Sequence, residues 1–232
     1  MNFLFTAKPL CKHVWIIFLV LSFGFNLSQA GSTNDNYVAY DYLEAVEEAG
    51  MIEPDEIVPL PAITAPKVRV VTWTAYPDSY PVGKKSLLKW GDVWITLDGA
   101  VQSYCEKSKQ GEQVSDIEKL LGLPPGSGAK RVFVTLEANS ADMFRPCADP
   151  SITAETCSAD FPKGVSESHM AWYAQQSAGS YQTNPGYPWT RLGYTYNWKE
   201  GKSEVGPAEF VVRKGSTVLS ISIKDTATYC SE

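Results

Sequence analysis

Four widely spaced cysteines constrain the fold of this chain more than any other feature of its sequence. They are Cys105, Cys147, Cys157 and Cys230, and a fifth, Cys11, lies near the start. In an oxidising compartment an even set predicts disulfides. We favour Cys147–Cys157, which closes a short loop, with Cys105–Cys230, which ties the C-terminal end to a helix. A metal site is the alternative, but the spacings are wide and no His or CxxC accompanies them. Neither a metal nor a cofactor is therefore expected.

Residues 1–30 indicate such a compartment. Two lysines precede an apolar run from Val14 to Phe25, and Ser28-Gln29-Ala30 then places small residues at a cleavage site. This is the layout of a secretory signal peptide, so we expect cleavage after Ala30. A retained anchor is the alternative, but the run is shorter than the roughly twenty apolar residues that span a bilayer. The protein is therefore expected to be exported, periplasmic or secreted, with no membrane span after cleavage.

Charge is unevenly distributed along the chain. Without residues 1–30, 18 Lys and Arg stand against 26 Asp and Glu. The whole excess lies in residues 31–66, which hold eight acidic residues and no basic one, whereas residues 67–232 balance at 18 of each sign. A chain without a basic stretch lacks the electrostatic footprint of a nucleic-acid-binding protein, so no nucleic-acid partner is expected.

Residues 31–66 read as an acidic, proline-containing arm or linker. A helix is expected over 37–49, ended by Gly50. One of its faces is apolar and is formed by Tyr42, Ala45, Val46 and Ala49. Four prolines between residues 54 and 66 then favour extended chain, because each lacks an N–H and disfavours helix in its predecessor. The segment is either a solvated tether or an arm wrapped on the domain, and its charge and prolines favour the tether.

Residues 67–232 carry the signals of a globular domain. Runs of β-branched and aromatic residues predict strands at 68–74, 93–97, 131–137, 192–198, 208–213 and 217–223. Helices are expected at 100–107, 115–122 and 166–177. Because strands and helices mix without regular βαβ alternation, we expect an α+β class. The prediction is a single domain with a largely antiparallel sheet and two or three helices, stapled by disulfides.

Two local patterns make sharper predictions. Ser115-Asp116-Ile117-Glu118 is a capping-box pattern, which places the start of a helix at Ser115. Lys214-Gly215-Ser216 fits the turn of a hairpin that joins the last two strands. The stretch 138–164 between a strand and a helix is long and irregular, and loops of that length are uncommon without a staple or a role.

The block Gly186–Trp198, with the sequence GYPWTRLGYTYNW, has five aromatics in thirteen residues. Alternation along a strand places Leu192, Tyr194, Tyr196 and Trp198 on one face. We favour a core face whose hydroxyl and indole groups find partners; the alternative is an exposed platform for a sugar ring or peptide. Tyr187, Trp189 and Arg191 precede the strand and are the better surface candidates, because loops carry function on rigid scaffolds.

His169 is the only histidine after residue 30. Helical spacing places it on one face with Trp172, Tyr173 and Gln176. A packed histidine bonded to a neighbour is the favoured interpretation, and a general base facing the 186–191 turn is the alternative. No G-x-S-x-G elbow is present to support a serine nucleophile.

Three motifs carry a resemblance. They are FRPC at 144–147, HxAW at 169–172, and the Gly186–Trp198 block. Together they are similar to a set of uncharacterised bacterial exported proteins, over about Trp90 to Ile223. The resemblance implies export and a single domain, and it carries no activity or functional residue.

These observations favour a non-enzymatic exported domain of the cell envelope. We expect it to bind an envelope protein, a glycan or a small ligand through Trp189, Arg191, His169, Tyr187 and Tyr173. The first alternative is a hydrolase-like enzyme with His169 as its catalytic residue. The second is a structural subunit docked through its acidic N-terminal arm.

Overall fold

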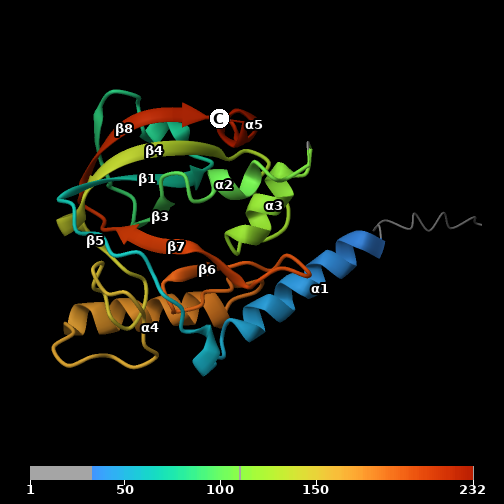
Figure 1. The fold of residues 1–232 in the computed structure, drawn as a ribbon, viewed down its shortest axis with the longest axis horizontal. Coiled ribbons are helices and arrows are strands. Elements are labelled where there is room, and N and C mark those ends of the chain that lie inside the picture. Colours follow the sequence, from blue (N-terminus) through green and yellow to red (C-terminus); the bar gives the residue numbers. More distant parts are fainter. Residues whose placement is uncertain (1–32, 110, 232) are drawn as a thin grey trace, which may run out of the picture.

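Strands form where β-branched and aromatic residues concentrate. The computed structural model describes residues 33–109 and 111–231, so the predicted signal peptide, residues 1–30, lies outside the described residues. These ranges contain one antiparallel sheet of eight strands, in the order β2-β8-β4-β1-β3-β7-β5, with β6 paired to β7 (Figure 1). The strands are β1 Lys67–Thr74, β2 Lys85–Leu87, β3 Val93–Leu97, β4 Val132–Asn139, β5 Met143–Phe144, β6 Tyr194–Tyr196, β7 Val205–Val212 and β8 Thr217–Lys224.

Alternation along the strands gives the sheet two apolar faces. Val70 of β1 lies opposite Leu136 of β4, and both pack in the larger hydrophobic core with Phe210. The neighbouring positions point the other way. Trp73 and Phe133 lie opposite each other and pack on that second face with residues of the helices. Both faces of the sheet are therefore covered.

The sheet curls, and this brings together strands that are far apart in its order. Lys214-Gly215-Ser216 does join β7 to β8, and Gly215 has the positive φ of a tight turn. The predicted hairpin is nevertheless wrong, because β7 pairs with β3 and β5 while β8 pairs with β4 and β2. Leu88, just after edge strand β2, exchanges backbone hydrogen bonds with Gly215 and Ser216 instead. The curvature of the sheet, and not the turn, decides the pairing.

Five helices lie in the described chain: α1 Thr33–Glu48, α2 Gln102–Cys105, α3 Gln113–Leu120, α4 Glu167–Tyr181 and α5 Thr226–Cys230. Short 3-10 turns occur at Pro54–Glu56, Pro77–Ser79 and Ser140–Asp142. α2, α3 and α5 cover the second face over β1 and β4, and α4 runs along the opposite side of the molecule (Figure 1). None of these described helices is long and apolar enough to cross a membrane. The predicted α+β class with a disulfide-stapled antiparallel sheet is confirmed.

The capping-box prediction is wrong. α3 begins at Gln113, so Ser115 and Glu118 both lie inside the helix. The Glu118 carboxylate accepts a hydrogen bond from the Gly128 backbone N–H at 2.5 Å. The Glu118 side chain therefore makes a tertiary contact with Gly128, and not the helix cap that the local pattern predicts.

Both favoured disulfides are present. Cys105–Cys230 links α2 to α5, and Cys147–Cys157 closes the loop after β5. The second disulfide lies in a small apolar cluster with Leu60, Leu192 and Tyr194.

Residues 31–66 do not form a solvated tether, because their described part packs on the domain. The apolar face of α1 is buried, with Tyr42 at 1% exposure and Ala45 at 3%. Further along, the backbone N–H groups of Leu60 and Ile63 donate to carbonyls of the 147–157 loop. The tether interpretation is wrong because the fold buries apolar residues along the segment, from Tyr42 and Ala45 to Leu60 and Ile63.

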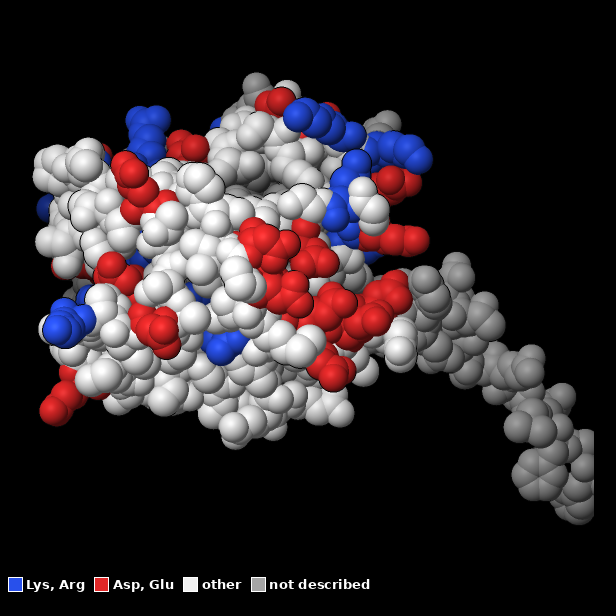
Figure 2. Space-filling model, turned by 60° about the horizontal axis from the view of Figure 1, so that its bottom comes forward, with Lys and Arg blue, Asp and Glu red and all other residues white. Residues whose placement is uncertain are grey.

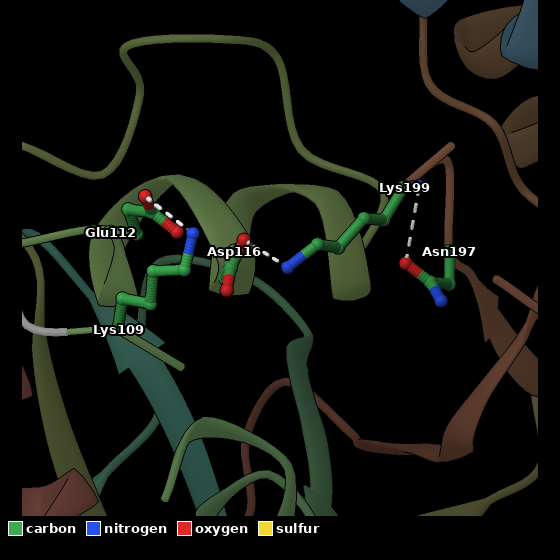
Figure 3. Close-up of polar contacts among 5 residues, drawn as sticks. All are labelled: Lys109, Glu112, Asp116, Asn197 and Lys199. Atoms are coloured by element: carbon green, nitrogen blue, oxygen red, sulfur yellow. Dashed lines mark hydrogen bonds and ion pairs between the residues drawn. The ribbon is translucent and has the colours of Figure 1, made fainter. Parts of the chain in front are cut away.

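An ion pair docks α3 on the segment after β6. Lys199 Nζ lies 2.6 Å from Asp116 Oδ1, and the Asn197 side chain accepts from the Lys199 backbone N–H (Figure 3). Burial by itself favours protonation of Asp116, but hydrogen bonds from Lys199 and Ser108 and nearby positive charges hold its pKa below the ordinary value. This contact joins α3 to the segment that follows β6.

Candidate functional site

A cleft of about 910 Å³ opens on the second face of the sheet. Its lining includes residues of β1 and β3, residues 121–123 just after α3, and the 187–189 turn. Gly122 has a φ of +63°, and a side chain there would meet Pro188 and the Tyr196 carbonyl. The close approach of these two segments therefore requires glycine.

A row of three residues crosses the floor of the cleft. Val71 of β1 lies opposite Thr96 of β3, and Thr96 lies opposite Glu209 of β7. Residues opposite one another in an antiparallel sheet point to the same face. All three line the cleft, so a hydroxyl and a carboxyl stand side by side on its floor.

The two polar groups of this row lack protein partners. The Thr96 hydroxyl is buried and makes no hydrogen bond within the described residues. The Glu209 backbone N–H donates to the Gly193 carbonyl. The Glu209 carboxyl, in contrast, has no charged or hydrogen-bonding partner among the described residues. Water reaches part of Glu209 through the cleft, yet burial raises the pKa of its carboxyl to about 8. Strongly perturbed groups of this kind concentrate at functional sites.

Aromatic side chains line the cleft and are unusually exposed. Trp90 is 89% exposed, Tyr76 75% and Tyr187 49%, and all three line the cleft. Trp94 and Trp189 are packed more deeply, with ring centroids 6.4 Å apart in an edge-to-face arrangement. Large apolar side chains exposed together on a folded protein mark binding surfaces.

Most other polar groups of the lining are engaged in the fold. Asp92 accepts from Trp172 Nε1 on one oxygen and from the Lys214 backbone on the other. Arg131 donates to the carbonyls of Ser127 and Trp73. Among the described residues, no group of three or more His, Cys, Asp or Glu is placed to hold a metal ion.

Two of the sequence-predicted site residues, Tyr187 and Trp189, line the cleft. Trp189 is nevertheless 5% exposed, and its indole N–H donates to the Pro146 carbonyl. Its ring packs against Trp172 and Tyr173 of α4. Trp189 therefore forms a wall of the cleft, while Tyr187 faces solvent.

His169 does not line the cleft. Its side chain is 4% exposed, its ring stacks on Trp172, and Nε2 lies 2.8 Å from the Cys147 carbonyl. Because a carbonyl only accepts, Nε2 carries the proton. Burial holds the pKa of His169 below its ordinary value, against the opposing effect of the bond to Cys147. These contacts describe a packed histidine of the core.

Arg191 and Tyr173 also lie outside the lining. Arg191 has a φ of +61° and donates from Nη2 to the Gly50 carbonyl, with its guanidinium over the Tyr181 ring. Tyr173 packs between Trp189 and Phe161. The structure therefore brings Arg191 and His169 to different places, and neither reaches the floor of the cleft.

The aromatic block has a packing role. Leu192, Tyr194 and Tyr196 are 2–3% exposed. The Tyr194 hydroxyl donates to the Glu56 carbonyl, and the Tyr196 hydroxyl donates to the Glu48 carboxylate. These contacts match the favoured core-face interpretation for the two tyrosines, whose partners lie on the acidic arm. Trp198 departs from it, because this residue is only partly buried and its indole N–H makes no hydrogen bond within the described residues.

Acidic side chains gather on one face of the molecule (Figure 2). Burial raises the pKa of Glu204, and the negative charges of Glu48, Glu56 and Glu53 raise it further. The arm therefore presents a negative surface even though its apolar side is packed.

Sequence reasoning missed the floor of the cleft. Glu209 is an acidic residue between the apolar stretches of β7, and that interruption was the one signal available. No sequence pattern distinguishes the aromatic residues of the lining, Tyr76, Trp90 and Trp94, from other aromatic residues. They lie around one cleft because the sheet curls and the loops around it come together.

Comparison with models of protein families, with curated proteins and with solved structures finds no match to this chain. The resemblance to bacterial exported proteins therefore stays a prediction.

Proposed function

We propose that this protein is an exported binding protein whose aromatic cleft takes a small organic ligand. The observation that carries the proposal is the gathering of Tyr76, Trp90 and Tyr187, all exposed, around one cleft. Flat side chains with two rotatable bonds lose little entropy when they close on a ligand. The volume of about 910 Å³ lies within the range of small-molecule sites.

The lining supports binding better than hydrolysis. Its two carboxyl groups are Asp92 and Glu209. Asp92 is engaged on both oxygens, whereas acid–base chemistry requires a group free to exchange a proton with the substrate. His169, the candidate catalytic residue, lies in the core instead. Glu209 is then the one carboxyl of the described lining without a partner, and we assign it to recognition of the ligand.

Export places the ligand outside the cytoplasm. The two disulfides of the described chain are compatible with an oxidising compartment. The proposed setting is therefore the periplasm or the extracellular space, with the signal peptide removed.

Ligand-observed NMR with a library of amines, sugars and aromatic acids tests this function. Tyr76→Ala and Trp90→Ala should abolish saturation transfer to any true ligand. Tyr40→Ala is the matched control, because Tyr40 is 65% exposed and lies outside the cleft. Ligands that bind all three variants equally, or no ligand in any class, would contradict the proposal.

A further inference from the structure

The Glu209 carboxyl on the floor of the cleft has no positively charged partner among the described residues. Glu209 is partly shielded from water, and no described side chain donates to its carboxyl or neutralises it. Burying a carboxylate without a partner is costly, so such groups are usually paired or protonated. A ligand that supplies a positive charge removes this cost and gains binding free energy from it.

A second, independent group on the floor also lacks a partner. The Thr96 hydroxyl is buried, makes no hydrogen bond within the described residues, and lies directly opposite Glu209. Buried polar groups are nearly always hydrogen-bonded in folded proteins. This hydroxyl is closed to solvent, so the floor group that a ligand can reach is Glu209, part of which is exposed.

Aromatic rings complete the environment. Trp94 lies two positions before Thr96 on β3, so the two side chains point to the same face. Trp90, Tyr76 and Tyr187 add exposed rings to the same lining. The faces of such rings attract cations, and rings grouped around a site recognise quaternary ammonium ligands.

We infer that the cleft binds an organic cation, a substituted ammonium group held by Glu209 and the surrounding rings. This inference rests on the proposed function and adds the chemical class of the ligand. A neutral ring compound is the main competitor, because it would use the aromatic rings without needing the carboxylate.

Other charged and titratable groups face the same cleft. Lys89 and Arg131 are the cations, but Lys89 is exposed and solvated and Arg131 is held by two carbonyls. Asp92 is engaged, as described above. The remaining titratable groups of the lining are Tyr76, Tyr80, Tyr187 and Tyr196. Burial raises the pKa of both Tyr80 and Tyr196, so Glu209 is the group expected to change charge between neutral pH and pH 9.

Choline is a suitable probe, because it carries a substituted ammonium group whose charge does not change with pH. Its neutral carbon analogue, 3,3-dimethylbutan-1-ol, has the same shape. Titration calorimetry should show binding of choline to the mature protein and at least about tenfold weaker binding of the analogue. Choline affinity should rise about tenfold from about pH 7 to pH 9, since the ionised fraction of Glu209 sets the competent population at a pKa of about 8.

Glu209→Gln keeps the shape of the side chain and removes its charge. It should weaken choline binding at least about tenfold and abolish the rise with pH, whereas the same change at an exposed carboxyl outside the cleft, Glu112→Gln, should retain both. If choline and its analogue bind equally well and Tyr76→Ala weakens both, the ligand is not recognised as a cation. The inference would then be wrong, whereas the proposed binding function would remain. If choline fails to bind but ligands of other classes bind in a way that depends on Tyr76, the cation inference is again wrong and the binding function remains. Loss of every ligand class would remove the binding function itself.

Discussion

The Arg191 guanidinium donates a hydrogen bond from Nη2 to the Gly50 carbonyl, 2.6 Å away, across 141 residues of sequence. Gly50 follows α1, and Arg191 lies within the Gly186–Trp198 block. Tyr42 and Gly186 make a second bond between the same two regions. The N-terminal arm and the aromatic block therefore stabilise each other.

Arg191→Ala should lower the free energy of unfolding by about 2 kcal/mol, because a charged donor is lost and the Gly50 carbonyl loses its partner. Chemical denaturation measures this change. Arg69→Ala is the control, since Arg69 is exposed on β1, and it should stay within about 0.5 kcal/mol of the parent. A variant of Arg191 with unchanged stability and weakened ligand binding would restore the sequence-based view of this residue as a binding group.

A chain that begins at Lys67 should lose much of its stability. It lacks the buried face of α1 and the backbone bonds from Leu60 and Ile63 to the disulfide loop. It also leaves Arg145 without its bond to the Pro61 carbonyl, inside the core. We expect the melting temperature to fall by about 10 °C or more, measured by calorimetry. Cooperative melting within a few degrees of the longer chain would show that the arm is dispensable after all.

Asp116→Asn should destabilise the protein by about 2 kcal/mol, because it removes a charged partner of Lys199 at a largely buried position. Glu112→Gln, at the N-cap of the same helix, is the matched control. Its contact with Lys109 is 3.9 Å long and exposed (Figure 3), and such pairs contribute little. The pKa of Asp116 is lowered in the folded state, so its contribution is present above the unfolded pKa and is lost as pH falls through the folded one. The difference between parent and Asp116→Asn should therefore shrink in acid, and a constant difference would contradict the ion pair.

His169 should make stability fall as pH decreases below about 6.5. Burial holds its folded pKa below that value, so the unfolded chain takes up the proton first and is favoured. The imidazole resonances should report a depressed pKa in NMR titration. His169→Gln should lose stability at neutral pH, and its deficit relative to the parent should narrow toward pH 5. A histidine that titrates at its ordinary value would contradict the packed environment.

Several elements were predictable from local pattern alone. β1 and β3 match their expected positions closely because alternation and flanking turns specify a strand locally. α4 begins after Ser166, whose side chain caps the helix by accepting from the His169 N–H. The edge strand β2 and the C-terminal helix α5 were missed, because each is short and depends on neighbours that lie far away in sequence.

By itself the sequence determined the fold class, which follows from composition and alternation, and it favoured, without deciding, the two cysteine pairings and the core packing of the Gly186–Trp198 face. Only the tertiary structure decided that the arm is packed, that β7 and β8 do not pair, and that Glu209 stands beside Thr96. The reason is physical. A local pattern indicates which side chains of a segment can be buried, whereas the curl of the sheet decides which segments far apart in sequence come into contact. The cleft lies between segments of this kind, so no sequence pattern connects the residues that line it.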